Sequence, residues 1–311
     1  MLRRVLLAAS ASQRVRQLIT TAPVTRDVVN RFVAGDDAAS ALAVTERLLG
    51  QGRSVTIDYL GEDTVDPEQA TAVTTEYVTL LELLGSAGLT IGGRAEVSVK
   101  PTAVGLGFAE HGEKTAAENI GRICAAAQAV GTTVTVDMED HTWVDATLRL
   151  VSDLRADFPD LGCVIQSYLR RSPGDCEALA VAGSRVRLCK GAYRAPDGFA
   201  FAARSEIDRS YARCLRILLD GAGYPMLATH DPRLVAIAKS RITTIGRDPG
   251  SFEYQMLYGI RTDEQAKLAA EGAQVRVYVP YGNDWYGYFM RRLAERPANL
   301  AFFLRALASR H

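Results

Sequence analysis

The chain has 311 residues, with 36 basic and 36 acidic side chains and 48% hydrophobic residues. This zero net charge lacks the basic excess that is typical of a nucleic-acid binder. The apolar content is too high for a disordered chain, and no apolar run approaches the roughly 18 residues of a membrane span. The length suits one α/β barrel of roughly 250 residues with an extension.

Residues 1–53 are predicted to form a helical extension. Residues 1–26 contain five Arg and no acid, which is compatible with a transit peptide. Because the chain is Arg-rich throughout, we favour an ordinary amphipathic helix that could also touch anionic lipid. A second helix is expected to start at Asp36-Asp37 and to end near Gly50.

From Ser54 onward, short β-branched segments alternate with longer helical patterns. The expected strands are Ser54–Leu60, Ala95–Val99, Thr133–Asp137, Cys163–Ser167, Val186–Lys190, Pro225–Thr229, Phe252–Met256 and Val275–Val279. The expected helices are Pro67–Leu84, Lys114–Ala129, Trp143–Asp157, Asp175–Ala182, Ala202–Leu219, Asp231–Ser240, Thr262–Glu271 and Asp284–Ala294. Eight such units predict a parallel (βα)8 TIM-like barrel over residues 54–311.

An open, doubly wound sheet is the alternative, but no G-x-G-x-x-G phosphate loop follows any expected strand. The five cysteines include no C-x-x-C pair, and the four histidines are scattered. We therefore expect neither a disulfide framework nor a metal site, and a reducing cytoplasm fits this cysteine usage.

Polar side chains stand at or near the carboxyl ends of the expected strands, where barrels carry their chemistry. They are Lys100, Asp137, Gln166, Arg187, Lys190, Thr229, His230, Glu253, Gln255 and Tyr278. Charges inside a barrel are costly unless they are paired or functional. Two interpretations stay open: an ion-pair network that only fills the barrel, or a site for an anionic or electron-rich ligand.

The last expected helix carries Tyr288, Arg291, Arg292 and Glu295 at spacings i, i+3, i+4 and i+7, which is one helical face. Two Arg side chains on one face can hold a carboxylate through forked hydrogen bonds, and Glu295 can orient them. The alternative is a solvated face of salt bridges.

Six ordered motifs resemble those of the proline dehydrogenases, flavoenzymes with a distorted (βα)8 barrel, and the likeness covers about residues 54–300. The motifs are Ser98–Lys100, Val136–Glu139, Arg187–Tyr193, Ala228–His230, Phe252–Gln255 and Tyr288–Glu295. The resemblance implies oxidation of L-proline to Δ1-pyrroline-5-carboxylate, the first step of proline catabolism. Hydride would pass from proline C5 to N5 of FAD, and a quinone would reoxidise the flavin.

The resemblance also implies roles for single residues. Lys100, Arg291 and Arg292 match the groups that hold the proline carboxylate, and Glu295 matches their acidic partner. Asp137 matches the active-site acid of strand three, and Arg187 matches the Arg beside flavin N5. The residues that match the substrate pocket are Leu188, Tyr193, Tyr278 and Tyr288, and those that match flavin contacts are Met138, Gln166, Lys190, Gly191, Ala192, Thr229 and His230.

Because the sequence ends at His311, we expect neither the aldehyde dehydrogenase domain nor the DNA-binding region of the bifunctional relatives. The product would pass to a separate pyrroline-5-carboxylate dehydrogenase. A cytoplasmic location is expected, with possible peripheral contact at the inner membrane face. Two other functions remain open: a Schiff-base aldolase that uses Lys100 or Lys190, and a barrel that binds carboxylates without catalysis.

Overall fold

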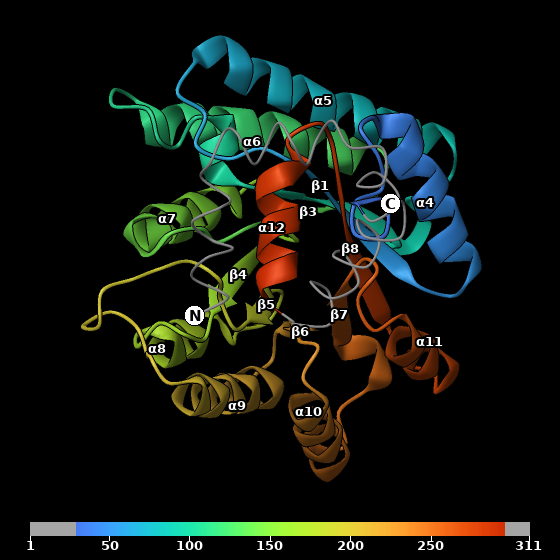
Figure 1. Ribbon diagram of the computed structural model, residues 1–311, viewed down its shortest axis with the longest axis vertical. Coiled ribbons are helices and arrows are strands. Elements are labelled where there is room, and N and C mark those ends of the chain that lie inside the picture. Colours follow the sequence, from blue (N-terminus) through green and yellow to red (C-terminus); the bar gives the residue numbers. More distant parts are fainter. Residues whose placement is uncertain (1–28, 296–311) are drawn as a thin grey trace, which may run out of the picture.

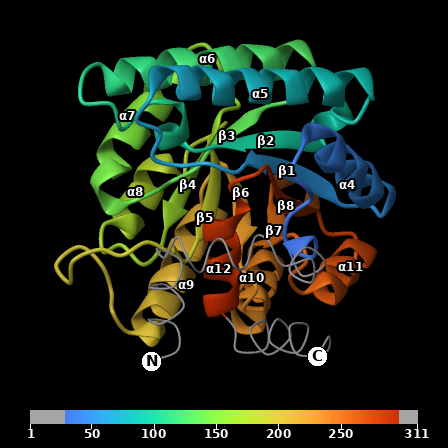
Figure 2. The same ribbon diagram turned by 45° about the horizontal axis from the view of Figure 1, so that its top comes forward.

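The computed structural model describes residues 29–295, with the backbone alone for residues 291–295. Its eight parallel strands close into a barrel in sequential order, so the predicted (βα)8 fold is confirmed (Figures 1 and 2). The strands are β1 (Ser54–Tyr59), β2 (Ala95–Val99), β3 (Val134–Val136), β4 (Gly162–Gln166), β5 (Arg185–Cys189), β6 (Tyr224–Ala228), β7 (Glu253–Leu257) and β8 (Val275–Tyr281).

The helices follow the strands in the order that the sequence predicts. They are α4 (Ala38–Gly50), α5 (Pro67–Ser86), α6 (Gly112–Ala129), α7 (Val144–Leu154), α8 (Ser172–Leu179), α9 (Arg204–Asp220), α10 (Pro232–Ile245), α11 (Thr262–Ala270) and α12 (Trp285–Glu295). The predicted end of α10 at Ser240 is wrong by five residues. The helix continues because Ile242 and Ile245 pack on the core, and it stops where Gly246 takes a left-handed conformation.

Helix α4 confirms the helix expected after Asp36-Asp37. The Asp37 side chain caps it by accepting a hydrogen bond from the Ser40 N–H at 2.8 Å. Its Ala41 and Leu48 lie in the main hydrophobic core together with barrel residues. The boundary at residue 53 stays a prediction, and residues 1–28 lie outside the described part of the chain.

Because side chains alternate along each strand, one face of the sheet packs against the surrounding helices and the other points into the barrel. The two faces differ in polarity. Apolar side chains such as Val55, Ile57, Val97 and Val277 are fully buried in the main core that the strands share with the surrounding helices. The alternate positions point into the barrel and are largely polar, and they include Thr56, Glu96, Ser98, Arg187, Glu253, Gln255, Arg276 and Tyr278. The main hydrophobic core therefore lies around the barrel, and its axis is filled by hydrogen bonds and ion pairs.

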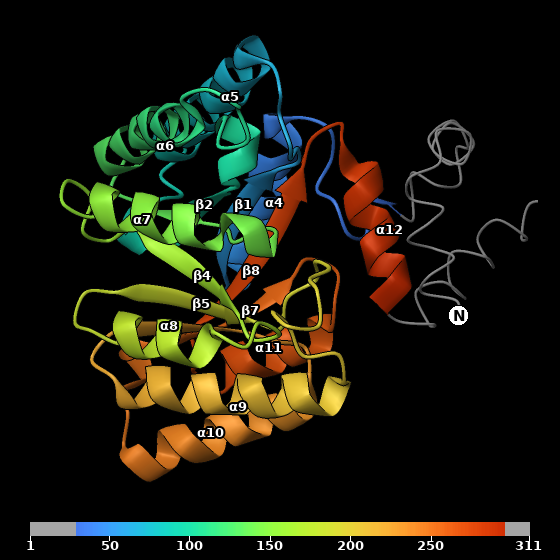
Figure 3. The same ribbon diagram turned by 90° about the vertical axis from the view of Figure 1, so that its left-hand side faces the viewer.

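Helix α12 lies across the carboxyl ends of the strands (Figures 1 and 3). A separate apolar cluster holds it there, in which Phe289 packs with Phe32, Leu60 and Ile260. Gly282 turns the chain back from β8 with φ of 112°, where an added Cβ would lie 2.8 Å from the Tyr59 ring. The backbone that carries Tyr288 to Glu295 is thereby brought over the barrel mouth. None of the helices within residues 29–295 is long and apolar enough to cross a membrane.

Candidate active site

The half of the barrel interior nearer the amino ends of the strands is closed by four charged side chains. Arg185 donates to Glu96 at 2.6 Å, and Arg276 donates to Glu253 at 2.8 Å. Burial opposes the ionisation of Glu96, but the three nearby Arg side chains outweigh it and lower its pKa to about 2. We call Glu96, Arg185, Glu253 and Arg276 the lower network. Its low pKa keeps Glu96 ionised at neutral pH, and all four side chains have partners inside the protein.

Arg187 connects the lower network to the mouth. Its guanidinium donates from Nε to Gln255 Oε1 at 2.5 Å, from Nη1 to Asp137 Oδ1 at 2.6 Å and from Nη2 to Ser98 Oγ at 2.9 Å. Only 4% of the residue is exposed. Because a guanidinium is planar and these bonds leave it in three directions, its plane is fixed from several sides.

Asp137 directly follows strand β3 and accepts from two predicted site residues. Arg187 binds Oδ1, and the Tyr278 hydroxyl donates to Oδ2 at 2.7 Å. The Arg187 guanidinium also lies 5.3 Å from the centre of the Tyr278 ring. Burial and the carboxylates of Asp137 and Asp58 raise the pKa of Tyr278, so its phenol keeps the proton that it donates. The structure thus brings together three residues that the sequence analysis assigned to one site.

Lys100 forms a buried ion pair with Asp58 from strand β1. Its Nζ lies 2.5 Å from Oδ1 and 2.6 Å from Oδ2 of that carboxylate. Burial lowers the pKa of Lys100, but the carboxylates of Asp58 and Asp137 outweigh this and raise it above its ordinary value. The side chain is 10% exposed and carries its proton, so it faces the mouth as an ammonium group.

Glu139 ties the loop after β3 to the loop after β2. It accepts from Thr102 N at 2.9 Å and from Thr102 Oγ1 at 2.6 Å, within the short helix Pro101–Val104 that follows Lys100. Burial raises its pKa to about 7, although the bonds from Thr102 pull it down. The backbone oxygen of Glu139 also accepts from Gln166 Nε2 at 2.7 Å. One carboxyl group therefore braces the loops that carry two predicted site residues.

The predicted flavin-contacting residues lie on strands β4 to β6 and in the loops after them, except for Met138, which lies in the loop after β3. Met138 is buried in an apolar cluster with Tyr168. Lys190 lies 2.5 Å from Asp208 and 3.1 Å from Asp231. A lysine ammonium has three donors, so a third direction remains for a ligand.

Thr229 and His230 follow strand β6. Thr229 Oγ1 accepts from the backbone N–H of Asp231 at 3.1 Å. His230 Nε2 accepts from the Leu257 N–H at 2.9 Å, which places the proton of a neutral imidazole on Nδ1. Gly191 has φ of 94°, and an added Cβ would lie 2.2 Å from the Tyr168 ring, so only glycine fits there.

The remaining predicted site residues lie in several different environments. The Tyr193 hydroxyl donates to Glu62 at 3.2 Å, and Ala192 is exposed in the same loop. Tyr288 is 6% exposed in the cluster beneath α12. Leu188 is fully buried in the main core on the opposite face of β5 from Arg187, so its pocket role stays a prediction. The side chains of Arg291, Arg292 and Glu295 lie outside the described part of the structure.

Three residues that contact the predicted site were missing from it. Asp58 has the strongest signal in the sequence, because the alternation in Ser54–Leu60 places it on the same strand face as Thr56. Glu139 lies within the Val136–Glu139 motif, but the sequence does not indicate its role, since its partner Thr102 lies 37 positions away. Gln255 is a polar residue of the expected strand Phe252–Met256, but nothing in the sequence pairs it with Arg187.

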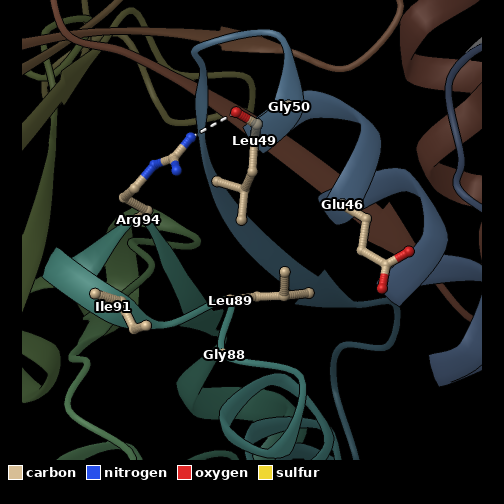
Figure 4. A pocket seen from close by; sticks show the side chains of 7 residues that line it. All are labelled: Glu46, Leu49, Gly50, Gly88, Leu89, Ile91 and Arg94. Atoms are coloured by element: carbon tan, nitrogen blue, oxygen red, sulfur yellow. Dashed lines mark hydrogen bonds between the residues drawn. The ribbon is translucent and has the colours of Figure 1, made fainter.

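A pocket of about 380 Å³ lies at the opposite end of the barrel, near the amino ends of β1 and β2 (Figure 4). Arg94 closes one side by donating to the Leu49 carbonyl at 2.5 Å. Glu46 and the side chains of Leu49, Leu89 and Ile91 line the rest. It contains none of the predicted site residues and stands apart from the polar mouth. The described residues also include no cluster of His, Cys, Asp and Glu able to hold a metal ion.

Comparison with known proteins decides the family. The family model for proline dehydrogenase matches residues 41–305. The chain is 40% identical over 283 residues to the proline dehydrogenase of Deinococcus radiodurans, covering 90% of each chain. It is 37% identical to proline dehydrogenase 1 of Bacillus subtilis, covering 99% of each. This chain belongs to the proline dehydrogenase family.

Solved structures agree in fold. Proline utilization A from Bdellovibrio bacteriovorus, inactivated by N-propargylglycine, superposes with a TM-score of 0.78 at 24% identity. Proline utilization A from Bradyrhizobium japonicum gives a TM-score of 0.72, also at 24% identity. The match to the first covers 86% of this chain, which spans about a third (32%) of that longer protein. At this identity the likeness supports the barrel, and the family rests on the sequence relatives.

Proposed function

We propose that the protein oxidises L-proline to Δ1-pyrroline-5-carboxylate. The observation that carries this is the family membership over nearly the whole chain. The geometry supports it, because Lys100 and the tightly held Asp137–Arg187–Tyr278 group lie together at the carboxyl end of the barrel.

The proposed cofactor is FAD, in a family that is flavin-dependent. The donor set fits such a group: Gln166 ends β4, Lys190 follows the adjacent β5, which carries Arg187, and Thr229 and His230 follow β6. When bound, the flavin supplies the acceptor for the hydride that leaves proline.

The protein's own task is to bind and orient proline. We assign the carboxylate to Lys100, Arg291 and Arg292, with Glu295 as the partner of the Arg pair. The pocket around the ring is assigned to Tyr193, Tyr278, Tyr288 and Leu188. Fixing the carboxylate at one end directs C5 of the ring toward the Arg187 side of the mouth, and orientation of this kind accounts for much of an enzyme's rate.

Asp137 is assigned to the reacting end of the site. Oxidation next to nitrogen develops positive charge on the substrate, and a carboxylate nearby stabilises that charge. Arg187 and Tyr278 hold both oxygens of Asp137, so its position is set before substrate binds. The substrate amine must lose its proton before oxidation, and we expect the rate of flavin reduction to rise with pH until the free amine dominates.

The aldolase alternative is not favoured by the lysine environments. A Schiff-base lysine needs a lowered pKa and a free amine. Asp58 holds Lys100 as an ammonium and raises its pKa, and two carboxylates bind Lys190.

The visible spectrum tests the proposed function directly. The purified protein is expected to be yellow and to bleach when L-proline is added without oxygen. Borohydride trapping of a substrate on lysine, in a colourless protein, would support the aldolase. Proline binding without bleaching would support a carboxylate-binding barrel and contradict oxidation.

We further propose that a quinone reoxidises the flavin and that a separate pyrroline-5-carboxylate dehydrogenase consumes the product. A cytoplasmic location with peripheral contact at the inner membrane face is proposed on the Arg-rich residues 1–26. Flotation with anionic liposomes at low salt tests the contact, and failure to float with them would contradict it.

A further inference from the structure

We propose that Gln255 is a positioning residue that sets the orientation of the Arg187 guanidinium, with Glu253 fixing Gln255 in turn. The inference rests on the proposed function, because it concerns the group that stands at the reacting end of the mouth. Neither residue is placed in contact with substrate. Both lie on strand β7 two positions apart, so they share the face that points into the barrel.

Within the described structure, Gln255 is the only side chain that hydrogen-bonds to Nε of Arg187. Its Oε1 accepts from Nε at 2.5 Å, while Asp137 and Ser98 take the two terminal nitrogens. Nε lies nearest the aliphatic stem, so a bond there restrains rotation of the whole guanidinium plane. Gln255 and Arg187 are 2% and 4% exposed, and bulk water does not readily replace this bond.

The amide of Gln255 is itself oriented by Glu253 of the lower network. Its Nε2 donates to Glu253 Oε1 at 2.5 Å, and the same oxygen accepts from Arg276 Nε at 2.8 Å. The Tyr224 hydroxyl donates to the other oxygen at 3.2 Å. A carboxylate can only accept, so the NH2 of Gln255 must face Glu253 and its oxygen must face Arg187.

The choice of an amide here has a physical reason. A neutral side chain with one donor end and one acceptor end joins the carboxylate of Glu253 to the guanidinium of Arg187 without adding charge. A glutamate at position 255 would place two carboxylates side by side, and one of them would have to hold a proton. The Arg276–Glu253–Gln255–Arg187 chain of hydrogen bonds thus restrains Arg187 at the mouth by linking it to the lower network.

The test compares Gln255→Met with Gln265→Met as a matched control. Methionine keeps the volume and removes the hydrogen bonds. Gln265 is also buried, and it bonds to Arg53 at 3.0 Å and to backbone carbonyls at the end of β7 and in the loop after it, but to none of the predicted site residues. Each variant is purified with its flavin. The limiting rate of flavin reduction, the Kd for proline and the midpoint potential of the bound flavin are then measured.

Gln255→Met is expected to slow flavin reduction by about tenfold to a hundredfold, as small misplacements of reacting groups do. It should also shift the midpoint potential, with the Kd for proline changed by no more than about twofold. Gln265→Met should change neither the rate nor the potential. Wild-type rate and potential in Gln255→Met, or the same losses in both variants, would overturn the proposal.

Gln255→Glu provides a second measurement that does not depend on how Gln255→Met folds. When Glu253 and the carboxyl group at position 255 share one proton, they reproduce the hydrogen bonds of the wild type. When that proton is lost, these hydrogen bonds are disrupted. The midpoint potential of this variant is therefore expected to approach the wild-type value at low pH and to depart from it at high pH. A difference in midpoint potential between this variant and the wild type that does not change with pH would overturn the proposal. Wild-type protein that binds no flavin would contradict the proposed function and this inference with it.

Discussion

The two ends of the barrel interior use similar charged residues for different purposes. In the lower network, Glu96 has three Arg side chains around it and is fully buried. At the mouth, Lys100 has one carboxylate partner, Asp58, and Glu139 is held by neutral donors from Thr102. The lower network is therefore saturated by protein partners, whereas the mouth keeps charges that a ligand can engage.

This difference shows in the direction of the pKa shifts. The pKa of Glu96 is lowered to about 2, because the cations outweigh the cost of burial. The pKa of Glu139 is raised to about 7, because burial outweighs its hydrogen bonds. The lower network thus contains a carboxylate that stays ionised at neutral pH, whereas the mouth contains a carboxyl group with a pKa near neutral.

The largest effect is expected from Glu96→Gln. It leaves Arg185, Arg187 and Arg276 with less buried negative charge, and breaking a buried ion pair from one side typically costs about 3–5 kcal/mol of unfolding free energy. Urea unfolding at pH 7 measures the change. A loss below about 1 kcal/mol, the range of exposed ion pairs, would show that the lower network is not a saturated scaffold.

Glu139→Gln is expected to change how stability depends on pH. Because the folded pKa of Glu139 lies above its ordinary value of 4.5, its contribution is present below about pH 4.5 and is lost as pH rises through about 7. Relative to the variant, the wild type should lose about 3 kcal/mol of unfolding free energy between these limits. Urea unfolding of both proteins from pH 4.5 to 8 measures this. Parallel curves would show that Glu139 does not titrate in the folded protein.

Lys100→Met should act on substrate more than on the fold. Burial already raises the pKa of Asp58, so Asp58 can take up a proton once its partner is lost. The KM for proline is expected to rise about 10- to 100-fold, the size of one charged hydrogen bond. Steady-state kinetics measure it, with flavin content as the control. An unchanged KM in folded, flavin-loaded protein would remove Lys100 from the carboxylate site.

The smallest effect is expected from Glu271→Gln on the surface. Glu271 pairs with Lys239, and the two side chains are 43% and 39% exposed. Solvent screens such a pair, so neither the urea midpoint nor the KM for proline should move beyond experimental error. A shift comparable to that of Glu96→Gln would mean that burial does not separate the two kinds of ion pair.

Much of the barrel and part of its site could be predicted from local patterns. Strand Ala95–Val99 was predicted with the same boundaries that the structure has, because a short β-branched segment between turn residues is a local signal. Asp137, Arg187 and Tyr278 were assigned to one site, and they are in contact. Asp58 and Gln255 could not be paired with Lys100 and Arg187 in this way, since those partners lie 42 and 68 positions apart.

The order of the eight strand–helix units and the strand ends that carry polar groups follow from the amino-acid sequence alone, since alternation and turn chemistry are local. The zero net charge argued against nucleic acid as a partner, but it gave no information on how charges are arranged inside the barrel. Which cation meets which carboxylate depends on the folded barrel, because its closure places β1 beside β8 and brings distant strands to one axis. That closure converts a neutral composition into a saturated lower network and a mouth with charge available to a ligand.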